Sequence, residues 1–317
     1  MSLDKLDVRD VFFDEVYEQC KFNPNLFVIS ADVDAFSLRK IAQDFPEQFL
    51  NAGVSEQNMI NIAAGMALYG KRVVCYSIAS FATLRCFEQI KVNLCSHNLP
   101  VTIVGAGAGF SFGYDGPTHH GHQDLSSMRL LPEMSIVELS SNDLAQEAAK
   151  YINKIDGPCY IRLDKGEHAD WSNKTSHFGE GFRFLRTMKK VNLVTNGHMT
   201  NIVLQACDEL AKVGIEIGVI DLFFVKPTPK NFVSEVLALS DHIISVEENC
   251  VSGGLGTILA EEIARGKFTT KLTGIGAPDK QFIEYGDRSW FHRKYGLCKE
   301  GLIKKVKKTL NGAPNTA

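Results

Sequence analysis

Short apolar runs alternate with amphipathic stretches along most of the chain. Five runs are almost continuously apolar, as buried parallel strands are, and they lie at residues 26–30, 73–78, 101–105, 135–139 and 159–163. The stretches between them carry apolar residues at helical spacing and lie at 8–21, 55–69, 82–97 and 141–154. This alternation predicts an α/β domain built on a mainly parallel sheet.

The alternation stops in a polar, turn-rich segment at residues 164–188 and then resumes. Further strands are predicted at 191–195, 215–221, 243–247 and 271–275, and helices at 199–213 and 255–266. We therefore predict two α/β domains with parallel sheets. The first covers residues 1–165, a linker covers 166–189, and a second, smaller domain covers 190–317.

Composition narrows the class of protein. Hydrophobic residues make up 44% and charged residues 22% of the 317 residues, which is typical of globular proteins. The 34 basic and 37 acidic residues leave a net charge of −3, so the basic excess of a nucleic-acid or membrane-surface binder is missing. No apolar stretch approaches the roughly 18 residues of a membrane span, and residues 1–10 are too charged for a signal peptide.

Eight cysteines are scattered through the chain without any Cys-x-x-Cys pair. In a chain of this length, this spacing indicates reduced, mostly buried thiols rather than a disulfide or zinc framework. Together with the charge balance, it predicts a soluble, cytoplasmic protein that binds neither nucleic acid nor membrane.

The first candidate for chemistry is an acid placed just before a predicted helix. The segment Asn51-Ala-Gly-Val-Ser-Glu56-Gln-Asn puts Glu56 in the first turn of the helix at 55–69. The positive end of the helix dipole favours an acid at this position, and that alone would account for Glu56. A functional role is the alternative interpretation.

The second candidate is a segment rich in glycine and histidine that follows the strand at 101–105. Six glycines fall within residues 105–121, and three histidines and two aspartates fall within residues 115–124. Ligands of α/β proteins bind at the carboxyl ends of parallel strands, which favours a catalytic or substrate-binding role here. A metal site and an ordinary polar loop remain alternatives, since His-His-x-His on such a loop has no recognised ligand geometry.

Two further segments have simpler interpretations. Phe81, Leu84 and Phe87 share one face of the predicted helix at 82–97, and most such apolar stripes belong to a core. Residues 247–256 form a strand end followed by a glycine-rich turn into a helix. Tight-turn chemistry explains the second segment at least as well as a binding site does.

Taken in order, five motifs resemble one protein family. They are Ser30-Ala-Asp32, Glu56-Gln-Asn, the segment from Phe81 to Phe87, Asp115-Gly-Pro-Thr-His119, and Glu247-Glu followed by Gly253-Gly-Leu-Gly256. The chain resembles the pyrimidine-binding and C-terminal domains of the transketolase family of thiamine-diphosphate enzymes. The resemblance implies a thiamine-diphosphate pyrimidine-binding fold followed by a smaller transketolase C-terminal domain, both α/β with parallel sheets.

The family resemblance also implies a partner. Full-length members carry a diphosphate-binding domain in which a Gly-Asp-Gly motif leads to an Asn and holds Mg²⁺, and these 317 residues contain no such motif. The chain thus resembles the C-terminal subunit of a split transketolase, active only with an N-terminal subunit that supplies the diphosphate-binding domain and the metal site. The expected assembly has two copies of each chain, and the expected reaction transfers a two-carbon ketol unit between sugar phosphates.

The resemblance assigns cofactor roles to several residues. Glu56 would be catalytic, because a carboxyl that hydrogen-bonds the aminopyrimidine N1′ favours the imino tautomer in which the 4′-nitrogen is basic. Phe81, Leu84 and Phe87 would hold the aminopyrimidine ring, although the family usually has an aromatic residue where Leu84 stands. Asp32 would lie near the cofactor, where the subunits meet.

The resemblance assigns substrate roles to others. Asp115 and His119 would hydrogen-bond the sugar, and His119 would also act on the developing charge of the carbonyl oxygen. Lys165 and Arg9 would bind a substrate phosphate, although Lys165 offers a point charge where the family usually has the fork of an Arg. Gly107 stands where transketolases have a histidine that reads a sugar hydroxyl, which predicts an unusual donor.

Two other functions stay open. The run His119-His-Gly-His122-Gln-Asp-Leu-Ser also resembles deoxyxylulose-phosphate synthases and the β subunits of 2-oxo acid dehydrogenases, which decarboxylate an oxo acid. The chain could instead be a non-catalytic partner that only completes a dimer, although the presence of Glu56, Asp115 and His119 argues against this.

Overall fold

The structure, a computed structural model, describes residues 6–171 and 177–312. The chain forms two compact units, and each unit consists of two separate stretches of the sequence. The first unit contains Met1–Ala108 and Gln123–Trp171, and the second contains Gly109–His122 and Ser172–Ala317. Residues 172–176 of the linker predicted over 166–189 lie outside the described residues.

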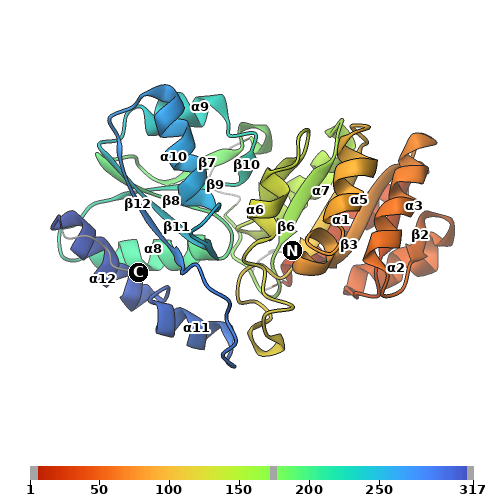
Figure 1. Ribbon diagram of the computed structural model, residues 1–317, viewed down its shortest axis with the longest axis horizontal. Coiled ribbons are helices and arrows are strands. Elements are labelled where there is room, and N and C mark those ends of the chain that lie inside the picture. The colour runs from red at the N-terminus through yellow and green to blue at the C-terminus, as the bar shows by residue number, and fades with distance from the viewer. Residues whose placement is uncertain (1–5, 172–176, 313–317) are drawn as a thin grey trace. The chain divides into compact units, whose positions relative to one another are not determined.

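The first unit is built on a parallel sheet (Figure 1). Its strands follow the order β5-β6-β4-β3-β1-β2, and every pairing between them is parallel. Their bounds are β1 Leu26–Ser30, β2 Phe49–Asn51, β3 Arg72–Ile78, β4 Val101–Ala106, β5 Ser135–Glu138 and β6 Cys159–Leu163. Strands β4 and β6 are buried at every position, which explains why most of their residues are apolar.

Helices flank this sheet in two groups. Helices α1, α2 and α7 pack together, and α3, α5 and η2 pack together. The bounds are α1 Val8–Cys20, α2 Phe36–Asp44, η1 Pro46–Gln48, α3 Glu56–Leu68, α4 Ala79–Thr83, α5 Phe87–Gln89, the π-helical η2 Ile90–Cys95, α6 Asp124–Arg129, α7 Asn142–Tyr151 and η4 Ile152–Lys154. The single helix predicted over 82–97 is therefore interrupted between Thr83 and Phe87.

The second unit has a sheet of its own, with strand order β12-β11-β8-β9-β7. Its pairings are parallel except that β7 runs antiparallel to β9. The bounds are β7 Phe182–Arg186, β8 Val191–Thr195, β9 Gly218–Leu222, β11 His242–Cys250 and β12 Lys271–Ala277, with the short β10 at Phe224–Lys226. Strand β7 lies within the range that the sequence predicted as linker.

The helices of the second unit surround an apolar core. Their bounds are η3 Gly113–Asp115, η5 Phe178–Glu180, α8 Met199–Ala211, α9 Lys230–Phe232, the π-helical η6 Val233–Leu237, α10 Leu255–Gly266, α11 Arg288–Tyr295 and α12 Lys299–Leu310. Side chains of β8, β9, η6 and α10 meet in one cluster that includes Val194, Ile220, Val236 and Leu259. The two α/β domains with mainly parallel sheets predicted from the sequence are confirmed.

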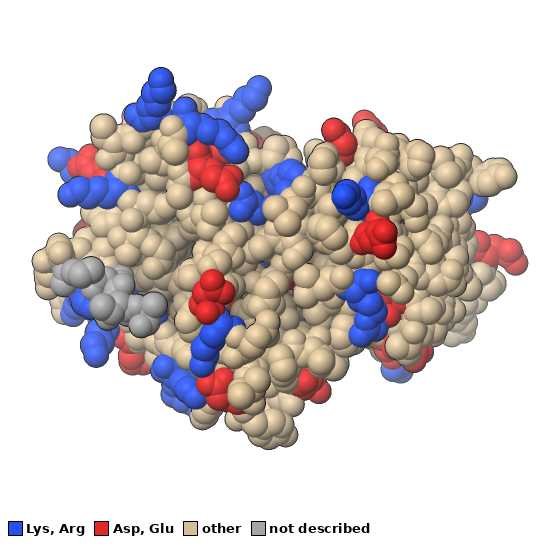
Figure 2. All heavy atoms as spheres, in the orientation of Figure 1, with Lys and Arg blue, Asp and Glu red and all other residues tan. Residues whose placement is uncertain are grey.

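Several expectations from composition can be compared with the structure. None of the eight cysteines forms a disulfide, and seven of them are buried. Among the described helices, none is both long and apolar enough to cross a bilayer. On the face shown in Figure 2, basic and acidic side chains are interspersed.

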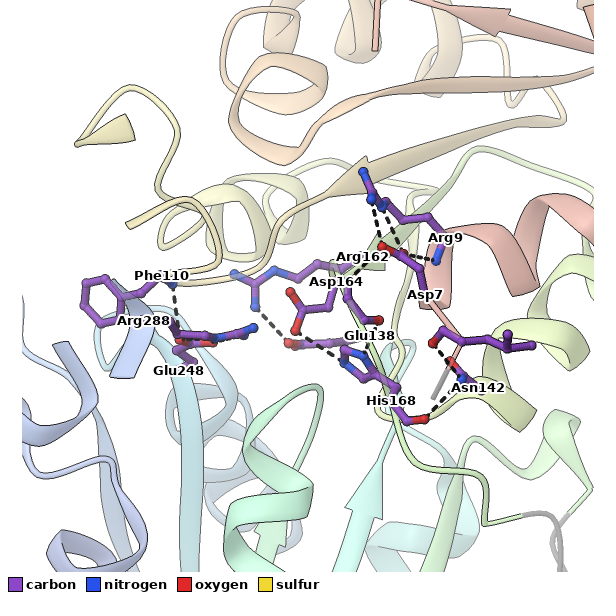
Figure 3. A network of polar contacts seen from close by, with 12 residues as sticks. Asp7, Arg9, Phe110, Glu138, Asn142, Arg162, Asp164, His168, Glu248 and Arg288 are labelled. Carbon is purple, nitrogen blue, oxygen red and sulfur yellow. Dashed lines mark hydrogen bonds and ion pairs between the residues drawn. The ribbon is translucent and has the colours of Figure 1, made fainter. Parts of the chain in front are cut away.

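A buried ion-pair cluster lies inside the first unit. The Arg162 side chain on β6 is 1% exposed, and its Nε and Nη2 donate to the two carboxylate oxygens of Asp124 at 2.8 and 3.0 Å. Its Nη1 donates to Glu138 Oε1 on β5 at 2.9 Å, and the Tyr160 hydroxyl donates to Asp124 at 2.6 Å. One guanidinium thus joins α6, β5 and β6, and its contact with Glu138 is drawn in Figure 3.

We expect Arg162→Met to destabilise the first unit by about 3–5 kcal/mol, because it leaves the carboxylates of Asp124 and Glu138 buried without their cation. The measurement is denaturant unfolding followed by circular dichroism. Lys150→Met is the matched control, because Lys150 pairs with Glu147 on the surface of α7, where an ion pair contributes less than about 1 kcal/mol. A loss in the Arg162 variant no larger than in this control would contradict the prediction.

Candidate functional site

Glu56 is buried although it is the first residue of helix α3. The chain turns at Gly53, whose φ of +72° suits glycine, and α3 begins three residues later. Met59, Ile60 and Ala63 bury one side of the helix, and Glu56 itself is only 2% exposed. A carboxyl placed in a first turn for the helix dipole alone does not need to be buried, so the dipole does not by itself account for Glu56.

The cation beside Glu56 is Arg85, which the sequence analysis did not single out. Arg85 Nη1 donates to Glu56 Oε2 at 2.7 Å, and the guanidinium carbon lies 4.1 Å from the centroid of the Phe81 ring. The Gln57 side chain donates to the Arg85 carbonyl at 3.2 Å. The structure therefore brings Glu56 and Phe81 to one guanidinium, a grouping whose only sequence signal is a basic residue between Leu84 and Phe87.

The segment predicted to hold an aromatic ring lies across the break between α4 and α5. Cys86 interrupts the helix with φ −106° and ψ 9°, and its thiol contacts the Phe81 carbonyl at 3.2 Å. Phe81 and Phe87 are half-buried, whereas Leu84 is 43% exposed. The three residues thus do not form one stripe on one helix, and Leu84 contributes the most open side chain.

Asp32 lies at the carboxyl end of β1, where an Asn side chain holds it. Its φ is +56°, in the left-handed region. The Asn51 side chain accepts from the Asp32 amide and donates to its carboxylate, each at 3.2 Å, and also accepts from the Gly53 amide at 2.9 Å. Asn51 therefore connects Asp32 to the turn that leads into Glu56, a role that sequence reasoning missed although Asn51 stands in the quoted motif.

The two predicted phosphate-binding residues belong to neighbouring backbone segments of the first unit. Arg9 forms a two-point ion pair with Asp7, through Nε to Oδ1 at 3.0 Å and Nη2 to Oδ2 at 2.7 Å. Asp7 also accepts from the amide of Gly166, the residue after Lys165, at 3.2 Å (Figure 3). Because Asp7 occupies the Nε–Nη2 edge of the guanidinium, Arg9 is engaged within the protein, while the Lys165 side chain is exposed.

The glycine- and histidine-rich loop Gly109–His122 belongs to the second unit. Gly109 and Gly121 exchange backbone hydrogen bonds of 2.8 and 3.0 Å that close the base of the loop. Phe110 stacks on Phe291 with centroids 4.3 Å apart, and the Phe110 amide donates to Glu248 Oε1 at 3.2 Å. The base of the loop is therefore packed into the C-terminal part of the chain.

The buried carboxylate of Glu248 binds the backbone of this loop. The carboxylate accepts from Arg288 Nε at 2.8 Å and from the Phe110 amide at 3.2 Å (Figure 3). It also contacts His292 Nε2 at 2.7 Å. Burial by itself would raise the pKa of Glu248, but the charges and hydrogen bonds of Arg288 and His292 outweigh it and hold the pKa well below its usual range. Glu248 was noted in the sequence only as part of a turn motif.

The outer part of the loop presents the predicted sugar-binding residues. Asp115 ends η3 and is exposed, and His119 is half-exposed with its Nδ1 2.9 Å from the Thr118 hydroxyl. His120 and His122 are instead buried, and their rings contact the carbonyls of Gly113 and Glu248 at 3.3 and 2.9 Å. This division favours the substrate interpretation for His119 and a packing role for the other two histidines.

Two glycine-containing segments have structural explanations. Glu247 accepts from the amides of Leu255 and Gly256 at 2.7 and 2.8 Å, so its carboxylate caps the start of α10, and a Cβ at Gly254 would collide with it. The turn interpretation of residues 247–256 is thereby favoured. Gly107 is buried with a φ of +89°, and its amide donates to the Leu163 carbonyl at 2.9 Å.

Comparisons with other proteins agree with this architecture. The transketolase pyrimidine binding domain matches residues 4–169, and the transketolase C-terminal domain matches residues 181–302. One subunit of the apulose-4-phosphate transketolase of Actinobacillus succinogenes is 32% identical over 85% of this chain and 88% of that protein. The 1-deoxy-D-xylulose-5-phosphate synthase of Carboxydothermus hydrogenoformans is 31% identical over 97% of this chain, which spans only 49% of the synthase.

A solved structure extends the similarity to three dimensions. A split-gene transketolase, described as an inactive β4 tetramer, superposes with a TM-score of 0.85 at 29% identity. The match covers 96% of this chain and 99% of that one, so the two chains share their whole two-domain architecture.

We expect Glu248→Gln to destabilise the second unit by about 3 kcal/mol at pH 7, because a buried ion pair is broken while part of its hydrogen bonding is kept. Since the pKa of Glu248 is lowered on folding, its contribution is present above the unfolded value of about 4.5 and disappears as the pH falls toward the folded value. Calorimetric melting should therefore show a gap between wild type and variant that narrows below about pH 4.5.

Glu261→Gln is the control for this measurement, because Glu261 pairs with Arg265 on the surface of α10 and contributes less than about 1 kcal/mol. A gap between wild type and Glu248→Gln that stays constant down to pH 3 would rule out the proposed linkage.

Proposed function

The chain belongs to the transketolase family of thiamine-diphosphate-dependent enzymes, and we propose that it is the C-terminal subunit of a split transketolase. In this proposal it transfers a two-carbon ketol unit between sugar phosphates, in an assembly of two such chains with two N-terminal subunits. The N-terminal subunit carries the diphosphate-binding domain and the Mg²⁺ ligands. Similarity over nearly the full length of a split-gene transketolase and of the apulose-4-phosphate transketolase subunit supports this division of labour.

The observation that carries the proposal is the buried carboxyl of Glu56 beside the Phe81 ring. A carboxyl at 2% exposure is suited to sharing a proton with a ring nitrogen, because little water competes for the hydrogen bond. Phe81 and Phe87 offer aromatic surface for a flat heterocycle. Asp32 is connected to the turn before Glu56 through the side chain of Asn51, which hydrogen-bonds both Asp32 and the turn. This donor set fits the aminopyrimidine end of thiamine diphosphate.

Each residue then has a definite task. Thiamine diphosphate supplies, when bound, the nucleophilic carbon that a protein side chain lacks. Glu56 holds a proton at the pyrimidine N1′ and so makes the 4′-nitrogen basic, while Phe81, Leu84 and Phe87 orient the ring and exclude water. These tasks all fall to the chain's own first unit.

In this proposal the substrate is recognised by residues of the loop in the second unit and by Lys165 and Arg9 of the first unit. Asp115 and His119 are open enough to hydrogen-bond sugar hydroxyls, and His119 can stabilise charge on the reacting carbonyl oxygen. Lys165 is exposed and offers its charge to a phosphate. Arg9 is already held by Asp7, so in this proposal it contributes to binding by positioning the segment around Gly166.

An oxo-acid reaction is the second candidate, because a 1-deoxy-D-xylulose-5-phosphate synthase is 31% identical over almost the whole of this chain. The two candidates differ in the donor, since an oxo acid releases CO₂ and a ketose phosphate does not.

The experiment that tests the proposal is reconstitution. We expect the isolated chain to show no turnover, and its mixture with the subunit that carries the diphosphate-binding domain to transfer a ketol unit from a ketose phosphate to an aldose phosphate. Release of ¹⁴CO₂ from labelled pyruvate by the same mixture would favour the oxo-acid reaction instead. Full activity of the isolated chain would disprove the split-enzyme proposal.

In the reconstituted complex, we expect Glu56→Gln to slow deuterium exchange at C2 of bound thiamine diphosphate by about 10²–10⁴-fold, the usual contribution of a positioned proton-transfer group. Gln fills the same space but cannot share a carboxyl proton, and it is an equally good helix former, so fold and assembly should persist. Exchange is followed by quenched-flow NMR, and assembly by light scattering. Wild-type exchange in the Gln variant would remove Glu56 from the reaction.

A further inference from the structure

We propose that Arg85 is a removable cap on the aminopyrimidine site: its guanidinium occupies the groups that bind the ring and has to leave when the ring enters. This inference rests on the proposed role of Glu56 in cofactor activation. It adds a positioning residue that controls when Glu56 becomes able to act.

The first observation is the asymmetry of the ion pair. Arg85 Nη1 lies 2.7 Å from Glu56 Oε2, but the Glu56 side chain is 2% exposed and the Arg85 side chain is 42% exposed. Glu56 is fixed by its place in the first turn of α3, whereas Arg85 reaches inward from solvent. The member of the pair that can leave is therefore Arg85.

The second observation is that the same guanidinium covers Phe81. Its central carbon lies 4.1 Å from the ring centroid, the geometry of a cation–π contact. One side chain thus touches two of the groups proposed to hold the aminopyrimidine ring, the carboxyl of Glu56 and an aromatic surface. A planar guanidinium that hydrogen-bonds an acid and stacks on a ring presents the same two features as an aminopyrimidine.

The backbone of Arg85 is held while its side chain is long enough to move. Arg85 lies in the interruption between α4 and α5, and its carbonyl accepts from the Gln57 side chain at 3.2 Å. Breaking the contacts with Glu56 and Phe81 therefore requires only rotations about side-chain bonds. The guanidinium then reaches water, where its charge is fully solvated.

Removal of the cap also changes the proton count. In the ion pair Glu56 is an anion and can only accept hydrogen bonds, whereas sharing a proton with a ring nitrogen requires a carboxyl that carries one. Arg85 leaves as a cation, because a guanidinium is not deprotonated in proteins. The proton that Glu56 gains must therefore come from solvent, and no other bond forms or breaks.

The Cys86 thiol is a titratable neighbour of this pair. It interacts with the charges of both Glu56 and Arg85, and burial raises its pKa to about 12. Cys86 is therefore neutral near pH 7 and neither supplies the proton nor replaces Arg85 as a partner.

The test uses the reconstituted complex and titrates Mg²⁺–thiamine diphosphate by calorimetry, which gives Kd. Arg85→Met keeps the length and apolar stem of the side chain but removes the charge. We expect this variant to bind the cofactor about 10- to 100-fold more tightly than wild type, since one charge-assisted contact no longer has to be broken. Unchanged or weaker binding would overturn the proposal, because Arg85 would then be a bystander or a ligand of the cofactor.

Two further variants make the interpretation specific. Arg85→Lys retains the charge and should bind the cofactor more like wild type than like Arg85→Met, so an affinity equal to that of the Met variant would overturn the proposal. In a Glu56→Gln background, Arg85→Met should have little effect on Kd, because the ion pair is already lost. An undiminished effect there would also overturn the cap. Arg265→Met, which removes a surface cation of α10, should leave Kd unchanged.

These measurements separate the inference from the proposed function. If the wild-type complex binds no thiamine diphosphate, the proposed function is wrong. If it binds the cofactor and transfers a ketol unit while the Arg85 variants match wild type, the function stands and only the cap is wrong.

Discussion

A buried carboxylate has to be compensated, and this requirement recurs throughout the protein. Moving an anion out of water costs several kcal/mol unless a cation and hydrogen bonds replace the lost hydration. Both units meet this requirement with arginine. Arg162 pairs with Asp124 and Glu138, Arg183 with Asp221, Arg288 with Glu248, and Arg85 with Glu56. Each guanidinium joins elements that are distant in sequence, so these pairs help to select one arrangement of strands and loops.

The pairs differ in how exposed the arginine side chain is. The side chains of Arg162 and Arg183 are 1% exposed, so neither can leave without unfolding its surroundings. Arg85 is 42% exposed beside an almost fully buried carboxyl. An ion pair with one solvent-facing member is stable in the absence of a ligand and can still be opened by one. This pair is suited to a binding site because its carboxyl is shielded from water while its arginine can move into solvent.

The glycine- and histidine-rich loop lies in sequence between two stretches of the first unit, but it belongs to the second unit. Gly109–His122 follows strand β4 of the first unit, yet it packs with the second through Phe110, Glu248 and Arg288. The buried base determines where the open tip with Asp115 and His119 lies. Packing within the second unit therefore determines how the residues proposed to bind the sugar are held.

The sequence by itself determined the elements whose signal is local. Mostly apolar runs correctly predicted β1 at Leu26–Ser30 and β6 at Cys159–Leu163, because strands covered on both faces consist mainly of apolar residues. The motif around Glu56 and the segment from Asp115 to His119 were sufficient to identify the family. The hydrophobic periodicity did not predict the break in the helix at Cys86, because the chain departs from regular structure there. It also missed strand β7, where the alternation of polar and apolar residues is weak.

Only the tertiary structure decided which partner each charge has. Arg85 lies 29 positions from Glu56, and Glu248 lies 138 positions from Phe110, so no local pattern could connect them. The structure also separates neighbouring histidines by their exposure, because His119 is half-exposed whereas His120 and His122 are buried. These outcomes depend on which surfaces meet when the sheets and helices pack, because desolvation and hydrogen bonding act between residues that the fold brings together, whatever their separation along the chain.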